Sequence, residues 1–194
     1  MNLFKKEEII KYTINFSDPY ADITLMNYID KLINLYNFNH WVIVCIGTDR
    51  STGDSLGPLI GTRLKIHEAD NFLIIGTLDE PIHALNLNDT IEYIKINHPN
   101  SGVIAIDASL GKLTSVGHIQ ILNGPLRPGA GVKKELPEIG HFHITGIVNV
   151  GGFMEYFVLQ NTRLSLVIRM SEIISLAIIK IIEGKIKKET VVNN

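Results

Sequence analysis

Apolar residues recur with two different spacings along the chain. Over residues 21–37, Ile23, Met26, Ile29 and Ile33 lie three or four positions apart, which predicts a helix. Residues 41–46 form instead a short β-branched run, typical of a buried strand. Similar short apolar runs predict further strands at 72–76, 103–106, 117–122 and 143–148. Similar helical spacings predict further helices at 55–67, 88–96 and 162–184.

Strands that alternate with helices indicate an α/β protein with a mostly parallel sheet between two helix layers. The strand at 117–122 could join this sheet as an antiparallel hairpin. We therefore expect a three-layer α/β/α sandwich with a mostly parallel, mixed sheet. The 194 residues fit a single domain over 1–194, with a core at about 21–184, a short N-terminal segment and a frayed, Lys-rich C-terminal tail.

Composition narrows the class of protein. Hydrophobic residues make up 45% of the chain and charged residues 20%, as in ordinary globular proteins. The formal charge of −2 argues against a nucleic-acid partner. The apolar stretch at 164–182 is interrupted by Arg169, Glu172 and Lys180, and the N-terminus lacks a signal-peptide pattern, so we expect a cytoplasmic protein without a membrane span. The single cysteine, Cys45, should be buried and reduced.

Two aspartates follow predicted strands. In an open α/β sheet, ligands bind beyond the carboxyl ends of the strands, where the strand order reverses. Asp54 comes soon after the strand at 41–46 and Asp107 ends the strand at 103–106, and a 2-1-3 strand order would make these strands neighbours. Two carboxylates that lie so near each other share one proton, which leaves one acid and one base. Such a pair can activate a water molecule to attack a peptide carbonyl. A structural interpretation stays open, in which Asp54 caps the following helix and Asp107 binds backbone amides.

The glycine-containing loop at 47–57 allows another interpretation. Such a loop could hold a phosphate against the N-terminus of the next helix. It matches neither of the common phosphate-binding motifs, however, and Asp49 and Asp54 place negative charge there.

Three segments, in the same order, resemble the germination protease of spore-forming bacteria. Residues 46–58 (Ile-Gly-Thr-Asp-Arg-Ser-Thr-Gly-Asp-Ser-Leu-Gly-Pro) are similar to its G-x-x-x-x-T-x-D-x-L-G-P stretch. Residues 103–110 are similar to its I-D-A-L strand end, and residues 126–132 to its P-G-x-G-V loop. The chain is still more similar to the YyaC-type sporulation protein family, small relatives of matching length, over residues 41 to about 180.

This resemblance implies the phosphorylase/hydrolase-like fold of germination and hydrogenase maturation proteases, with Asp54 and Asp107 as the catalytic pair of an endopeptidase. The implied substrate is a protein or peptide, such as a spore protein, and the implied location is the mother cell or forespore. Two differences from the germination protease are the shorter chain and Gly53, which stands where that protease has proline. The rival function is a non-catalytic, sporulation-specific binding or regulatory module of the same fold. The chain could also form a homo-oligomer.

The loop that resembles P-G-x-G-V supplies the candidate substrate-binding residues. These are Arg127, Gly129, Gly131 and Lys133, which with the adjacent lysine could clamp a peptide or an acidic substrate; the alternative is a solvated loop. Asn149, at the end of the last strand, could contact the same crevice or serve as a turn residue.

Hydrogenase maturation proteases share this fold and hold nickel with acids and a later histidine. By that resemblance, Asp54 and Asp107 would be two ligands of nickel or zinc, with His118, His141 or His143 as the third. We expect no metal or other cofactor, because no motif fixes a histidine against the two acids.

Overall fold

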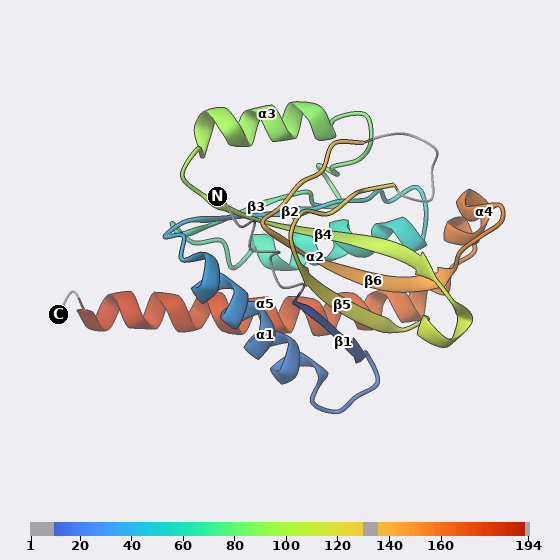
Figure 1. Cartoon of the computed structure of the whole chain (residues 1–194), viewed down its shortest axis with the longest axis horizontal. Coiled ribbons are helices and arrows are strands. Elements are labelled where there is room, and N and C mark those ends of the chain that lie inside the picture. The colour runs from blue at the N-terminus through green and yellow to red at the C-terminus, as the bar shows by residue number, and fades with distance from the viewer. Residues whose placement is uncertain (1–9, 130–135, 193–194) are drawn as a thin grey trace, which may run out of the picture.

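The computed structural model describes residues 10–129 and 136–192, and it has one six-stranded sheet between helices (Figure 1). The strand order is β1-β5-β6-β4-β2-β3; β6, β4, β2 and β3 are parallel, while β5 and β1 are antiparallel to their neighbours. The strands are β1 (Lys11–Asn15), β2 (Trp41–Cys45), β3 (Phe72–Ile75), β4 (Gly102–Gly111), β5 (His118–Asn123) and β6 (Phe142–Val150). The helices are α1 (Ala21–Tyr36), α2 (Leu56–Lys65), α3 (Leu87–Asn97), α4 (Glu155–Gln160) and α5 (Leu164–Val192), with 3-10 turns η1 (Gly53–Ser55) and η2 (Leu113–Ser115).

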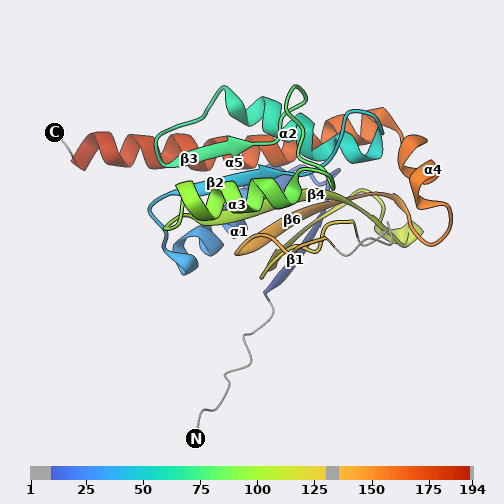
Figure 2. The same cartoon turned by 90° about the horizontal axis from the view of Figure 1, so that it is seen from above.

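Helices cover both faces of the parallel strands, as the sequence predicts. All five residues of β2 are buried, which is typical of a strand with a helix layer on each side. On one face, α1, α2 and α5 pack against the larger apolar core. On the other, Leu87 and Ile94 of α3 pack against Val42 and Val44 of β2. Figure 1 shows α3 above the sheet and α5 below it, and Figure 2, seen from above, shows α3 in front of the strands. The three-layer α/β sandwich is confirmed.

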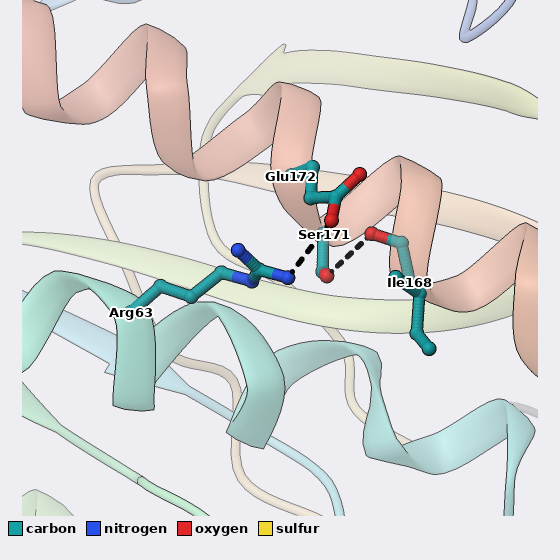
Figure 3. A network of polar contacts seen from close by, with 4 residues as sticks. All are labelled: Arg63, Ile168, Ser171 and Glu172. Carbon is teal, nitrogen blue, oxygen red and sulfur yellow. Dashed lines mark hydrogen bonds and ion pairs between the residues drawn. The ribbon is translucent and has the colours of Figure 1, made fainter.

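Helices α2 and α5 lie side by side on the larger core (Figure 3). Arg63 of α2 pairs with Glu172 of α5 at 3.1 Å, but both side chains are partly exposed, and such surface pairs add little stability. Ser171 is fully buried, and its hydroxyl donates to the Ile168 carbonyl oxygen at 2.7 Å. The packing of α2, the helix that follows Asp54, therefore depends mainly on apolar contacts.

Two ends of the chain differ from expectation. No strand was predicted before Ala21, yet β1 pairs with β5 and buries Ile14 in the larger core. The final helix also continues beyond its predicted end at Gly184, to Val192. The antiparallel addition at 117–122 is confirmed as β5, which pairs with β6.

Two expectations about burial and membranes can be compared with the structure. Cys45 is a free, buried thiol, as predicted. Over the described ranges, no helix combines the length and the apolar character that crossing a membrane requires.

Candidate functional site

The site begins where β2 ends and β4 continues. The last residue of β2, Cys45, pairs with Ile106 of β4. After β2 the chain turns toward the loop that follows β3. There the Gly47 N–H donates to the Ile82 carbonyl oxygen at 2.7 Å. β4 continues to its end paired with β6. Asp107 is thus the first residue of β4 beyond its pairing with β2, and the predicted neighbourhood of the two strands is confirmed.

Glycines hold η1, which carries Asp54, against the end of β2. Gly47 has φ +147°, and a Cβ there would lie 1.9 Å from the Asp54 carbonyl oxygen. A Cβ at Gly57 would lie 2.0 Å from the Ile46 carbonyl oxygen. The Thr48 N–H closes the loop by donating to the Asp54 carbonyl oxygen at 3.1 Å. The lack of a Cβ atom at Gly47 and Gly57 therefore allows η1, which carries Asp54, to lie this close to the end of β2.

Asp54 and Asp107 line the same cavity, which has a volume of about 390 Å³. Its walls come from the loop after β2, η1, the second half of β4, the loops after β3 and β5, β6 and α4. The lining residues are Ile46, Gly47, Thr48, Asp54, His83, Ala84, Asp107, Ala108, Ser109, Leu110, Leu126, Arg127, Pro128, Gly129, Leu136, Thr145, Glu155, Tyr156 and Leu159.

The surroundings raise the pKa of both acids. Burial, followed by the negative charge of Asp54, raises the pKa of Asp107 well above its usual range, although the Ala108 N–H opposes this by donating to Oδ1 at 2.8 Å. Burial also raises the pKa of Asp54, and the nearby Ser51 hydroxyl acts in the opposite direction. Both carboxyls therefore hold a proton more readily than an exposed aspartate does.

Positive charge does not neutralise this pair within residues 10–129 and 136–192, where no lysine or arginine forms an ion pair with either acid.

The structure also bears on the structural interpretation of each acid, helix capping by Asp54 and binding of backbone amides by Asp107. Asp54 is not the cap of α2; that residue is Ser55, whose side chain makes no capping hydrogen bond. Asp107 does bind a backbone amide, that of Ala108, but this amide belongs to a strand rather than a loop. Capping therefore does not account for Asp54.

The structure brings some of the other candidate residues to the cavity. Arg127 and Gly129 line it, and the Arg127 Nε lies 2.6 Å from Glu138 Oε1 in an exposed ion pair. Gly131 and Lys133, with the lysine that follows, lie outside the described residues.

Asn149 lies at the end of β6 but outside the cavity lining. Its amide donates to the Val158 carbonyl oxygen and to Thr162 Oγ1, each at 3.2 Å, and its Oδ1 accepts from the Val150 N–H. The side chain of Asn149 therefore connects β6 to α4 and to the turn before α5.

The three candidate histidines are held elsewhere by their Nδ1 atoms. His143 Nδ1 lies 2.9 Å from the Gly124 carbonyl oxygen, and His118 Nδ1 lies 3.0 Å from that of Ser115. His141 Nδ1 accepts from the Val103 N–H. In the described part of the chain, no three His, Cys, Asp or Glu side chains are grouped to hold a metal ion. As these side chains lie, they do not fit a nickel or zinc site, and we derive no step through a metal.

Helix α4 adds residues to the site that the sequence pattern did not reveal. Glu155 and Tyr156 line the cavity, and so does His83 from the loop after β3. α4 reaches η1 because Gly53 leaves space there: a Cβ at Gly53 would lie 2.7 Å from the Leu159 side chain. The residue that departs from the germination-protease pattern is thus the one against which α4 packs. Figures 1 and 2 both place α4 at the end of the sheet where β4 and β6 end.

Comparisons with known proteins agree with this fold. The model of the family described as "Protein of unknown function (DUF1256)" matches residues 13–177. A Bacillus subtilis relative, described as uncharacterized protein YyaC, is 50% identical over 173 residues, covering 89% of this chain and 84% of the relative. The solved structure of HycI, a NiFe hydrogenase maturation protease from Thermococcus kodakarensis, superposes with a TM-score of 0.54 at 16% identity, covering 80% of this chain and 99% of HycI. At that identity, the likeness to HycI shows a shared fold.

Proposed function

The chain belongs to the DUF1256 family, and we propose that it is a peptidase in which Asp54 and Asp107 activate a water molecule. The observation that carries this proposal is one cavity lined by two acids, with the pKa of Asp107 raised by burial and by the charge of Asp54. Groups with strongly shifted pKa values in a cavity are typical of catalytic sites. The fold shared with a maturation protease supports the same class of reaction.

The two acids divide the work by their protonation states. Ionised Asp54 accepts a proton from water as the water oxygen bonds to the peptide carbonyl carbon. Protonated Asp107 donates its proton to the developing oxyanion, which gives a gem-diol. As the C–N bond breaks, Asp54 passes the proton it took from water to the leaving nitrogen, and Asp107 takes a proton back from a hydroxyl of the gem-diol. The products are a carboxylic acid and an amine, and both acids return to their starting protonation states. Arg127 and Gly129, at the rim, are proposed to contact the substrate.

The biological setting of the proposal rests on resemblance. The similarity of residues 46–58, 103–110 and 126–132 to germination protease supports a role in sporulation and a spore protein as substrate. A cytoplasmic location, in the mother cell or forespore, belongs to the same proposal.

Cleavage of a defined peptide pool by the purified chain, followed by mass spectrometry, tests the proposal. Asp54→Asn and Asp107→Asn should each lower the cleavage rate by about 10²–10⁴-fold, the usual contribution of acid–base catalysis. Asp49→Asn is the matched control, because Asp49 is an exposed aspartate in the same loop and lies outside the cavity lining. A folded wild-type protein that binds peptides but cleaves none would identify the chain as a binding module instead.

A further inference from the structure

The second half of β4 leaves one backbone edge open along the cavity. β2 pairs with β4 up to Ile106, whereas residues Asp107–Gly111 pair with β6 in the described sheet. Four consecutive residues of this segment, Asp107, Ala108, Ser109 and Leu110, line the cavity. The cavity therefore lies beside β4 where β2 would continue if it were longer.

The direction of the backbone groups follows from the last hydrogen bond between the two strands. The Ile106 carbonyl oxygen accepts from the Ile46 N–H at 2.7 Å, so the backbone groups of Ile106 face β2. These groups alternate in direction along a strand, so those of Ala108 and Leu110 face the same side as those of Ile106. The register with β6 shifts between Ser109 and Leu110, but the Gly111 carbonyl oxygen still accepts from the Gly151 N–H on the β6 side at 2.9 Å, so the alternation continues through the shift. The Ala108 N–H is already taken by Asp107 Oδ1 at 2.8 Å. That bond brings the Asp107 carboxyl to the side of β4 on which the open edge lies.

The residues of this edge lack the charge and the proline that often protect an exposed strand. Native edges are often blocked by proline, by charged side chains or by a covering element. The residues Ala108, Ser109, Leu110 and Gly111 include neither charge nor proline, and the first three are partly exposed. At about 3.3 Å per residue, the segment from Asp107 to Gly111 is about 13 Å long, which is enough for a few residues of an added strand.

Apolar side chains surround the open edge. Leu110, Leu126 and Leu159 line the cavity, and Tyr156 of α4 lines it while remaining 59% exposed. Phe157 is 53% exposed and makes an edge-to-face contact with the Tyr156 ring. An extended segment placed here would direct alternate side chains toward these groups.

We propose that the protein binds its substrate as an extended, apolar peptide segment that adds to the open edge of β4 at Ala108–Leu110, next to Asp107. Main-chain hydrogen bonds would supply affinity, and the apolar groups would select alternate side chains, as in other cases of strand addition. The inference rests on the proposed peptidase function, since it identifies the substrate class of the same site. It requires substrates that are unfolded or locally extended.

Binding can be separated from cleavage by using the Asp54→Asn variant, because Asp107 belongs to the edge itself. The probe is an acetylated and amidated octapeptide of alternating valine and threonine, together with eight versions that each carry one N-methylated amide. The ¹⁵N-labelled variant is titrated with each peptide to millimolar concentration, and backbone amide shifts are followed by NMR. Addition of a strand predicts shifts at Ala108 and Leu110. It also predicts that N-methylation at alternate positions weakens binding by about tenfold or more, while the positions between are tolerated.

A second pair of variants tests the apolar side of the site. Tyr156→Ser should weaken binding of the unmodified peptide several-fold, while Ile66→Ser should not, because Ile66 is 86% exposed and lies outside this cavity. No binding at millimolar peptide, shifts elsewhere in the chain, or indifference to the position of the N-methyl group would overturn the inference. If the peptide binds at the edge as described but wild-type protein cleaves nothing, the peptidase proposal fails and strand addition stands.

Discussion

The two halves of β4 differ in almost every respect although they form one strand. Residues Gly102–Ile106 are buried and apolar and pair with β2, and Ile104–Ile106 pair with β6 as well. Residues Asp107–Gly111 are partly exposed, pair with β6 in the described sheet and include Asp107 and Ser109. The difference arises because β2 ends at Cys45, one pair before Asp107. In this protein, therefore, a strand that stabilises the core becomes a wall of the candidate site where its neighbour stops.

The first half should govern stability more than activity. Ile104→Ala removes a side chain that is 1% exposed, and such truncations typically cost about 2–5 kcal/mol in the free energy of unfolding. Ser109→Ala in the second half is the control and should change the free energy of unfolding by less than about 0.5 kcal/mol. Urea unfolding checks both values. Equal losses at the two positions would remove the contrast between the two halves.

The junction between β2 and η1 should affect both stability and activity. Gly47→Ala forces a side chain into a backbone with φ +147° and against the Asp54 carbonyl oxygen. We expect a cost of about 1–3 kcal/mol from the backbone alone, together with slower cleavage because Asp54 is displaced. Gly124→Ala is the matched control, since φ there is +86° but nothing lies within 4 Å of the added Cβ. If both variants lose equal stability and Gly47→Ala cleaves normally, close approach at Gly47 does not position Asp54.

The second half should carry a cost in stability that depends on pH. Because the pKa of Asp107 is higher in the folded protein than in the unfolded chain, its contribution to stability is present at low pH and is lost as pH rises through the folded value. Asp107→Asn does not titrate, so its free energy of unfolding should increase relative to wild type as pH rises above about 4, until the folded wild-type carboxyl is ionised. Asp49→Asn controls for the loss of one negative charge. A wild-type protein that gains stability over Asp107→Asn as pH rises would contradict the assigned shift.

The parallel part of the fold was predictable because β2 and the first half of β4, at its centre, are buried on both faces. The β-branched run at 41–46 and the intervening helix placed β2 beside β4, and this was enough to bring Asp54 and Asp107 together. In contrast, β1 was missed because it is a five-residue edge strand in which Ile14 is the one buried residue. An edge strand of this kind has little apolar alternation to distinguish it from a loop.

The walls of the cavity were less predictable. α4 has six residues, fewer than two helical turns, so a repeated helical spacing of apolar residues cannot be recognised in it. It also follows Gly151-Gly152, which indicates a turn. Its cap, Met154, adopts φ +49°, a conformation that a sequence pattern does not suggest for methionine. Glu155 and Tyr156 were therefore missed. The open edge of β4 also depends on where β2 stops, which is set by the turn at Gly47 rather than by residues of β4 itself.

A titration of the Asp107 carboxyl by ¹³C NMR, in wild type and in Asp54→Asn, is the most direct test of the central claim that the two acids share one site. In wild type, the pKa of Asp107 should lie well above its usual range, because burial and the charge of Asp54 both raise it. In Asp54→Asn the pKa should fall but remain raised, since burial persists when the charge is removed. An Asp107 carboxyl that titrates near the ordinary value of about 4 and does not respond to Asp54→Asn would contradict the account.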